Sequence, residues 1–294
     1  MHYKSVKSIL SAKNGINLFR GCEHGCIYCD SRSKCYRIEH NFEDIEVKEN
    51  ALELLEIALK KKKQKVMIGT GSMSDPYTPT EKNIEYTKKA LQLIEKYGFG
   101  IAIQTKSDLI LRDIDILDRI NQKAKTVVQI TLTTFDDNLC KKIEENVCPT
   151  SQRLKILSEM QKRDIPTVVW LCPILPFIND TEENLLSILE ACKKYDVKGI
   201  INFDFGLTLR EGNREYFYQK LEKNFPRQGL FTLYNKYFRE SYVCNSPHNE
   251  KLLKIFHQFC SQNKIMHNND EIFSYLNTFP KEKIHKDFLE FDFE

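Results

Sequence analysis

Six short apolar runs, separated by longer amphipathic stretches, constrain most strongly what this chain of 294 residues can fold into. The short runs are rich in β-branched residues and predict strands, whereas apolar residues that recur on one face predict helices. Strands that alternate with helices pair in parallel through right-handed crossovers. An open or partial (β/α)6 barrel satisfies this pattern, and so does a doubly wound sheet. The predicted strands are 16–19, 66–69, 100–104, 127–132, 167–171 and 200–205, and the predicted helices are about 48–63, 81–97, 112–121, 150–163 and 181–195.

The pattern changes after about residue 210. Residues 211–294 hold helical stretches that are rich in Phe and Tyr and show no clear β alternation. We therefore predict an α/β domain over residues 1–210 and a helical C-terminal extension over residues 211–294. The aromatic residues of the extension, Tyr216 and Tyr237 among them, either pack in a core or stack on nucleobases.

Ten cysteines are the unusual feature of the composition. The longest apolar stretch, residues 168–178, contains two prolines and is far shorter than the roughly 20 residues that span a bilayer. No apolar run follows the basic N-terminal residues, so we expect no secretory signal and place the protein in the cytoplasm. Because the cytosol keeps thiols reduced, the cysteines indicate metal or redox chemistry or buried small side chains. The net charge of +3 neither requires nor excludes nucleic acid.

Three of the cysteines follow the first predicted strand on one short loop, in the segment RGCEHGCIYCD. Cys22, Cys26 and Cys29 have the spacing C-x3-C-x2-C. Such a loop can hold three corners of a four-iron cluster and leave the fourth iron open to a ligand that is not protein. Structural zinc would need a fourth protein ligand, His24 or Cys35, and the spacing is not the paired C-x2-C of zinc ribbons and fingers. The loop therefore favours an iron–sulfur cluster over zinc.

This spacing, with Tyr28 immediately before the last cysteine, resembles the radical S-adenosylmethionine superfamily. The resemblance implies a partial (β/α)6 barrel, one of the two architectures left open above. It also implies a [4Fe-4S] cluster on Cys22, Cys26 and Cys29, whose open iron binds the methionine part of S-adenosylmethionine. In that superfamily an electron from the cluster cleaves the sulfonium, and a 5'-deoxyadenosyl radical then abstracts hydrogen from a substrate. A reduced flavodoxin- or ferredoxin-type electron donor is implied as well.

Five segments between about residues 15 and 260 resemble, in order, the spore photoproduct lyase-like branch of that superfamily. They are INLFRGCEHGCIYCD, TGSMSDPYTPTE, QTKSDLILRDIDIL, ITLTTFDD and PILPFINDTEEN. The S-adenosylmethionine contacts that follow from this resemblance are Gly69, Thr70, Gly71, Ser72, Lys106, Thr131 and Arg153. The first four match backbone that contacts the methionine amino group, although an ordinary strand-to-helix turn uses similar residues. The lysine and the threonine lie near strand ends, where barrels assemble their sites. The arginine is a candidate carboxylate clamp or a helix-surface residue.

Two positions depart from the branch. Ser72 aligns with the cysteine that returns a hydrogen atom to the substrate radical in the lyase, and a serine O–H bond is too strong for that reaction. Two tyrosines flank the last cluster cysteine of the lyase, and here Tyr28 remains while Asp30 takes the second position. These departures argue against spore photoproduct as the substrate. Other thiols that are either replacement donors or buried small residues are Cys35, Cys140 and Cys172.

The leading hypothesis is therefore a radical S-adenosylmethionine enzyme with an unidentified organic substrate, in which Tyr28 and Cys35 are the catalytic candidates. A nucleic-acid substrate is suggested only by analogy with the branch, and peptide, tRNA and small-metabolite substrates stay open. The alternative from another class is a nucleic-acid-binding protein with a structural metal at the cysteine loop and no catalysis. A third hypothesis is an electron-transfer protein that uses the cluster without S-adenosylmethionine.

Overall fold

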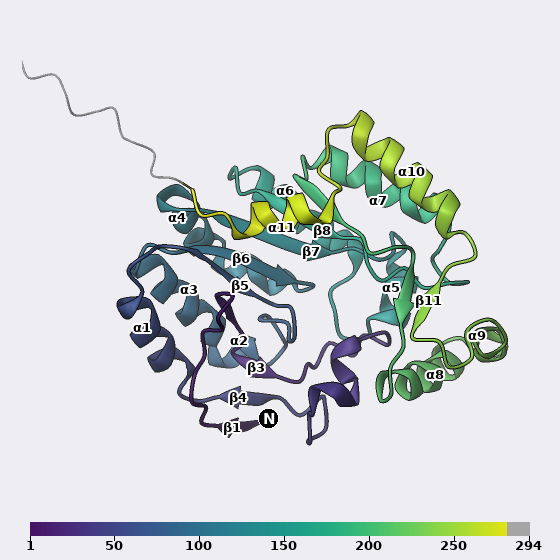
Figure 1. The fold of residues 1–294 in the computed structure, drawn as a ribbon, viewed down its shortest axis with the longest axis horizontal. Coiled ribbons are helices and arrows are strands. Elements are labelled where there is room, and N and C mark those ends of the chain that lie inside the picture. Colours follow the sequence, from purple (N-terminus) through teal and green to yellow (C-terminus); the bar gives the residue numbers. More distant parts are fainter. Residues whose placement is uncertain (281–294) are drawn as a thin grey trace, which may run out of the picture.

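In a computed structural model, which describes residues 1–280, six parallel strands form one curved sheet with two open edges (Figure 1). Their order along the sheet follows their order in the chain, whereas the order in a doubly wound sheet reverses partway along. The predicted partial barrel is therefore confirmed. The strands are β2 (Gly15–Ile16), β5 (Met67–Thr70), β6 (Gly100–Thr105), β7 (Thr126–Thr131), β8 (Thr167–Trp170) and β9 (Gly199–Ile201).

Helices cover the convex face of the sheet. Side chains that point outward from the strands, such as Ile68 and Val128, pack with the apolar faces of these helices in one buried core. Helix starts follow the expected chemistry, since the side chain of Thr181 accepts a hydrogen bond from the amide of Asn184, at 3.2 Å, at the start of α7. The covering helices are α1 (Ala51–Lys61), α3 (Tyr86–Lys96), α4 (Ile114–Lys123), α6 (Thr150–Gln161) and α7 (Glu182–Lys194).

The concave face is filled at one end by a helix of the C-terminal extension, α11 (Asn269–Asn277). Residues on the inner side of the strands, such as Met67 and Val127, pack against Ile272 and Leu276 of this helix. These inner residues lie toward the N-terminal ends of their strands. The filled end leaves the C-terminal strand ends free to build a site, which is where parallel α/β folds place their ligands.

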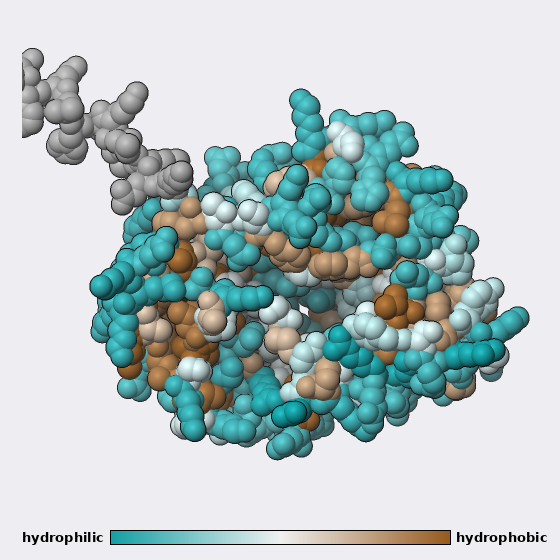
Figure 2. Space-filling model, viewed as in Figure 1, coloured by the Kyte–Doolittle hydropathy of each residue, from teal (hydrophilic) through white to brown (hydrophobic). Residues whose placement is uncertain are grey.

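Two smaller sheets frame the large one. Strands β1 (His2–Lys4), β4 (Glu46–Lys48) and β3 (Phe19–Arg20) form the N-terminal sheet, and β10 (Gly206–Thr208) pairs antiparallel with β11 (Val243–Asn245). Seen from the side of Figure 1, the surface is hollowed near its middle, between the N-terminal sheet and the large sheet (Figure 2). The remaining elements are the α-helices α2 (Glu81–Ile84), α5 (Asp137–Ile143), α8 (Asn213–Asn224), α9 (Leu230–Phe238) and α10 (Asn249–Gln262) and the 3-10 helices η1 (Asp30–Arg32), η2 (Lys34–Tyr36) and η3 (Asp108–Asp113).

Besides α11 on the concave face, the C-terminal extension contributes to two other cores. Helix α10 packs beside α7, and its Phe256 joins the core of the convex face. Phe217 of α8 and Tyr234 of α9 are fully buried with Ile27 of the cysteine loop, so these aromatic rings serve a core. Tyr237 is an exception, with 57% of its surface exposed. The boundary at residue 210 stays a prediction, and residues 281–294 of the predicted extension lie outside the described part of the chain.

The structure differs from the predicted elements in several places, and β1, β4 and β10 are strands that the sequence pattern did not predict. The first predicted strand is divided between β2 and β3, and the second predicted helix breaks at Glu85, whose φ is 53°. Helix α5 is too short to show periodicity, and β11 interrupts the predicted helical extension. Among the described residues, no helix is long and apolar enough to cross a bilayer.

Candidate functional site

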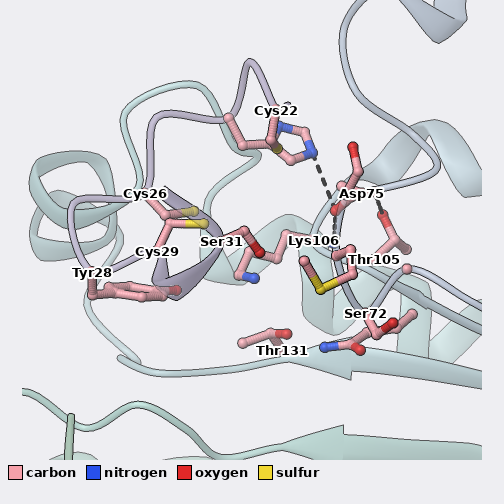
Figure 3. Close-up of a pocket in the computed structure, with 15 residues that line it drawn as sticks. Cys22, Cys26, Tyr28, Cys29, Ser31, Ser72, Asp75, Thr105, Lys106 and Thr131 are labelled. Carbon is pink, nitrogen blue, oxygen red and sulfur yellow. Dashed lines mark hydrogen bonds and ion pairs between the residues drawn. The ribbon is translucent and has the colours of Figure 1, made fainter. Parts of the chain in front are cut away.

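The cysteine loop, residues 22–29, follows β3 and is bound to its surroundings through its backbone. The amide of Cys22 donates to the carbonyl of Phe42 at 2.9 Å, and the amide of Ile27 donates to the carbonyl of Ile143 at 2.9 Å. The Ile27 side chain is fully buried between the loop and helices α8 and α9. Because backbone and apolar contacts hold the loop from outside, Cys22, Cys26 and Cys29 all line one cavity (Figure 3).

This cavity, of about 100 Å³, lies where the cysteine loop meets the C-terminal ends of β5, β6 and β7. Eight residues singled out from the sequence line it: Cys22, Cys26, Tyr28, Cys29, Gly71, Ser72, Lys106 and Thr131. Sequence reasoning did not assign a role in this site to seven further lining residues, which are His24, Ser31, Met73, Ser74, Asp75, Gln104 and Thr105. Residues that are far apart in the chain thus converge on one small polar space.

Six candidates from the sequence are not part of the cavity lining, namely Gly69, Thr70, Cys35, Cys140, Arg153 and Cys172. Gly69 and Thr70 are the last two residues of β5, where they pair with β2 and β6 inside the sheet. Cys35 lies on η2 and is exposed, with its Sγ 3.3 Å from Nη1 of Arg210. The structure therefore does not bring this thiol to the other candidates, because η2 carries it to the far side of the cysteine loop.

Arg153 has a third placement, which neither sequence alternative included. The side chain is fully buried and forms an ion pair with the buried carboxylate of Glu144. Its Nη1 donates to the carbonyl of Thr131 at 2.9 Å, and its Nε donates to the carbonyl of Cys148 at 3.1 Å. Since protein acceptors bind these donors, the guanidinium is committed to the wall behind the cavity and is not on the helix surface.

A buried carboxylate, Asp75, connects the cysteine loop to the end of β6. It accepts hydrogen bonds from the Thr105 hydroxyl at 2.6 Å and the Lys106 amide at 2.8 Å. Nε2 of His24, from the middle of the cysteine loop, lies 3.2 Å from the same carboxylate (Figure 3). Burial raises the pKa of Asp75, but His24 and these hydrogen bonds outweigh burial and lower the pKa to about 2. The cavity wall thus carries a fixed negative charge.

The sulfur atoms and Lys106 form the other charged part of the cavity. Burial raises the pKa of the Cys22 thiol to about 12, and burial also raises the pKa of Cys26 well above its ordinary value. Without a metal these groups are neutral thiols, whereas a coordinating metal deprotonates a thiol outright. Burial lowers the pKa of Lys106, but nearby groups that include Cys26 and Glu144 outweigh burial and raise the pKa, so the lysine stays cationic.

The donor set and the shape of the cavity fit a cluster with S-adenosylmethionine better than a single zinc ion. One zinc, about 2.3 Å from each sulfur, would hold the sulfurs roughly 3.8 Å apart. The three cysteine sulfurs do not form a group of atoms within 4.8 Å of one another, although all three line the cavity. The hydroxyl of Thr131 is buried in the lining without a hydrogen-bond partner, so it is free to bind a ligand.

The backbone at Gly71 is shaped for a close approach. Its φ is +102°, and a Cβ atom built on it would lie 2.1 Å from the carbonyl oxygen of Gln104. No other residue fits there without a backbone shift, because both the conformation and the space require glycine. Gly71 and Ser72, in the turn after β5, both line the cavity.

A buried polar network supports the cysteine loop from behind. The hydroxyl of Tyr28 donates to the Glu144 carboxylate, which also binds Arg153, and Sγ of Cys140 lies 3.5 Å from the same carboxylate. Burial raises the pKa of Tyr28 well above its ordinary value, and the neighbouring carboxylate adds to this effect. Glu144 has no local sequence signal, because its partners come from the cysteine loop and from α6. For Asp75 the sequence offers one signal, which is the Asp75–Pro76 step in the turn after the second predicted strand.

Comparisons with known proteins agree with this geometry. The sequence model of the radical SAM superfamily, whose name abbreviates S-adenosylmethionine, matches residues 16–192. An uncharacterized protein of Methanocaldococcus jannaschii is 31% identical over 220 residues, which cover 74% of this chain and 78% of that protein. An uncharacterized protein of Mycobacterium tuberculosis is 25% identical over 232 residues, which cover 76% of this chain and 66% of that protein.

Among solved structures, spore photoproduct lyase complexed with dinucleoside spore photoproduct is similar with a TM-score of 0.60. The identity is 14%, and the similarity covers 90% of this chain and 80% of that chain, so it shows a shared fold.

The residues matched by the superfamily model make up more than half of the chain and include every residue of the cavity lining. Membership implies an enzyme with a [4Fe-4S] cluster and S-adenosylmethionine, and it implies a reductant and a substrate. The match in sequence, the parallel sheet and the cysteine loop at its C-terminal edge lead to one conclusion. This chain belongs to the radical SAM superfamily.

Proposed function

We propose that this protein cleaves S-adenosylmethionine reductively at a [4Fe-4S] cluster held by Cys22, Cys26 and Cys29 and abstracts hydrogen from an organic substrate. The observation that carries this proposal is the convergence of three thiols, one unpartnered buried hydroxyl and the turn at Gly71 on the same cavity. When bound, such a cluster supplies the electron that converts S-adenosylmethionine to methionine and a 5'-deoxyadenosyl radical.

The chain's own residues bind and orient the reactants. The three cysteines supply thiolate ligands, and the cationic Lys106 offsets part of their negative charge or binds a carboxylate. Asp75 holds the loop at the end of β6 through His24, so the sulfurs keep their positions.

Two further groups are assigned to S-adenosylmethionine. The free hydroxyl of Thr131 binds one of its polar atoms, and the backbone around Gly71 and Ser72 approaches it closely. The role assigned to Gly69 and Thr70 is to position this backbone at the end of β5. Arg153 acts as a support for Tyr28 through Glu144, in place of the carboxylate clamp expected for it.

The reaction differs from that of spore photoproduct lyase in our proposal, although the chain stays in the lyase-like branch. Ser72 occupies the cavity position expected for the hydrogen-donor thiol. Cys172 is the better candidate donor than Cys35, because Cys172 lies two residues beyond Trp170, the last residue of β8, whereas Cys35 is exposed on η2. The dinucleoside bound by the lyase in its structure suggests a nucleic-acid substrate by analogy only. The substrate is otherwise unidentified.

We assign the electron to a reduced flavodoxin- or ferredoxin-type donor. The compartment that we propose is the cytoplasm, where the ten cysteines, all of them unpaired in the structure, would stay reduced.

The test is S-adenosylmethionine cleavage by protein reconstituted with iron and sulfide without oxygen. With dithionite, the wild type is expected to bind about four iron per chain and to form 5'-deoxyadenosine. Cys26→Ala removes a cluster ligand and is expected to reduce both iron content and product to background. Cys35→Ala is the matched control, because that thiol lies outside the cavity, and it keeps both properties.

Two outcomes contradict the proposal. Zinc bound in place of iron by the wild type and lost in Cys26→Ala would support the structural-metal alternative, and product formed equally by Cys26→Ala would exclude the assigned cluster loop. Transfer of deuterium from candidate substrates into 5'-deoxyadenosine would then identify the hydrogen that is removed.

A further inference from the structure

We propose that His2, His40 and Asp44 form a second metal site, for a divalent transition ion of the zinc class, at the edge of the N-terminal sheet. One ligand atom from each of the three residues lies within 4.8 Å of the others. The site contains no thiol and shares no residue with the cavity that carries the cysteines. It is therefore independent of the proposed function.

The fold brings the three residues together from separate positions in the chain. His2 begins β1 and pairs in register with Glu46, the first residue of β4. Asp44 lies two residues before β4, and His40 lies in the loop that leads to it. The two imidazole rings meet edge to face with their centroids 4.8 Å apart. The strand pairing β1–β4, at the N-terminal end of the chain in Figure 1, thus fixes the distance between these ligands.

The hydrogen bonds of His40 leave one nitrogen free for a metal. Its Nδ1 lies 2.9 Å from the backbone carbonyl of Asn41, and a carbonyl only accepts, so we assign the proton to Nδ1. Its Nε2 is buried and has no hydrogen-bond partner. A neutral imidazole in this tautomer offers the lone pair of Nε2, and metal-binding histidines are commonly oriented by a carbonyl in this way.

His2 has a carboxylate near each of its two ring nitrogens. Its Nδ1 lies 2.9 Å from Oδ2 of Asp44, and its Nε2 lies 3.8 Å from Oε2 of the buried Glu46. An ion between Nδ1 of His2, Nε2 of His40 and Oδ2 of Asp44 would replace the His2–Asp44 hydrogen bond. Glu46 would then accept the proton of Nε2, which is the carboxylate–histidine–metal arrangement found at zinc sites.

The donor set selects the class of ion. Two imidazoles and one carboxylate suit zinc and its neighbours in the first transition row, whereas calcium and magnesium prefer oxygen ligands alone. The side chains of His2 and Asp44 are 38% and 42% exposed, so solvent reaches the site and a water molecule can complete the coordination. The other oxygen of Asp44, Oδ1, binds the amino group of Met1.

The site is connected to the cysteine loop through a short path. Phe42 lies between His40 and Asp44, and its carbonyl accepts the hydrogen bond from the Cys22 amide. A Cβ at Gly21 would lie 2.5 Å from the same carbonyl, so the two segments are in close contact. An ion held by His2, His40 and Asp44 would cross-link β1 to the segment that binds the first cysteine, and so stabilise both.

The experiment uses protein loaded with iron and sulfide, or Cys26→Ala if the wild type takes up no iron, so that the cysteine loop does not bind the added zinc. Zinc is titrated without oxygen in competition with a chromogenic chelator. The wild type is expected to bind one zinc ion per chain and to unfold at a higher temperature with zinc than without it. His40→Ala and the double variant His2→Ala/His40→Ala are expected to lose both effects. Glu46→Gln, which removes the orienting carboxylate together with its ion pair to Lys4 at 3.3 Å, is expected to weaken binding about tenfold.

The control is His248→Ala, which removes an exposed histidine next to α10 and is expected to bind zinc as the wild type does. Circular dichroism of each variant without zinc separates loss of the site from loss of the fold. If a folded His2→Ala/His40→Ala variant binds zinc as tightly as the wild type, the site is wrong. If the wild type binds no zinc beyond its cluster, the site is also wrong, whatever the S-adenosylmethionine assay shows.

Discussion

The concave face of the sheet is apolar at one end and polar at the other. Toward the N-terminal strand ends, Met67 and Val127 are sealed by Ile272 of α11. At the C-terminal strand ends, Thr131 keeps a buried hydroxyl without a partner and Lys106 keeps a cationic side chain. The same strands build both ends. The two ends differ in polarity because different side chains point inward at each end and because α11 covers the apolar end. Apolar packing holds one end closed, and buried charges hold the other end in shape for ligands.

The largest expected effect on activity is at the polar end, at Gly71. In Gly71→Ala the new methyl would lie 2.1 Å from the Gln104 carbonyl at a φ of +102°. We expect the turn to shift at a cost of about 3 kcal/mol in unfolding free energy and to lose S-adenosylmethionine cleavage. Urea denaturation and the yield of 5'-deoxyadenosine measure the two effects.

Gly98 provides the matched control, because it precedes β6 at the sealed end of the sheet. Its φ is +68°, and a methyl group added there would meet no atom of the described residues within 4 Å, so only backbone strain opposes alanine. Gly98→Ala is expected to cost about 1 kcal/mol and to keep full activity per folded molecule. Equal loss of activity in both variants would mean that the comparison between the ends is wrong.

The next effect concerns the buried charges behind the polar end. Glu144→Gln leaves Arg153 in a fully buried position without its carboxylate. Breaking a buried pair in this way costs about 3–5 kcal/mol, and thermal or urea unfolding measures the loss. Glu95→Gln, which removes ion pairs with the exposed Arg119 and Lys123, is the control and is expected to cost less than about 1 kcal/mol.

The effect of Glu144→Gln also depends on pH. Burial raises the pKa of Glu144, but Arg153 and Lys106 outweigh burial and lower it below 4.5. The carboxylate therefore stabilises the fold above pH 4.5, and this contribution is lost as the pH falls through the lowered value. The stability difference between the wild type and Glu144→Gln is expected to shrink on acidification. A difference that stays constant down to the acid-unfolded state would contradict the assigned charge pair.

At the sealed end, Ile272→Ala tests apolar packing. The side chain is fully buried and contacts the inner face of β9 at Gly199, where a Cβ added to the glycine would lie 3.0 Å from the nearest isoleucine atom. We expect a loss of about 3 kcal/mol in stability, with the rate of S-adenosylmethionine cleavage unchanged in the folded protein. Ile57→Ala, at a position 40% exposed on α1, is expected to cost less than about 0.5 kcal/mol. A lower rate in folded Ile272→Ala would show that the two ends are coupled.

The sequence predicts the large sheet and the cysteine loop because both depend on local patterns. Strand and helix periodicities are read over a few residues, and the spacing of Cys22, Cys26 and Cys29 is a property of one loop. The turn after β5 is also local, and Gly71 and Ser72 line the cavity as the resemblance implied.

The sequence does not predict contacts between distant segments. Helix α11 is amphipathic, but nothing in its pattern says that it fills the concave face instead of covering the outside. The sequence alone leaves Arg153 as a candidate surface or ligand-binding residue. In the structure it forms a buried ion pair with Glu144, which lies nine positions earlier in the chain. Cys35 follows the cysteine loop closely in sequence, yet η2 turns it away from the cavity toward Arg210. In each case the missing information is a partner supplied by tertiary structure.

The smallest expected effect is a change in S-adenosylmethionine affinity, and it tests a single hydroxyl group. Thr131→Val replaces a buried hydroxyl that has no partner with a methyl of similar size, so no protein hydrogen bond is lost. Stability is expected to change by less than about 0.5 kcal/mol. If the hydroxyl binds S-adenosylmethionine, the loss of one hydrogen bond of about 1 kcal/mol weakens binding roughly fivefold. Equilibrium dialysis with the cluster-loaded protein measures this change.

Thr133→Val separates ligand binding from a general effect of the substitution. Thr133 has the same kind of buried hydroxyl without a partner, but it is not part of the cavity lining. Its variant is expected to bind S-adenosylmethionine as the wild type does, because the hydroxyl that is removed faces no ligand. Weaker binding in Thr131→Val alone places the ligand at the C-terminal end of β7. If both variants bind S-adenosylmethionine with the same affinity, the unpartnered hydroxyl of Thr131 does not contact the ligand. The polar end would then bind S-adenosylmethionine through other groups.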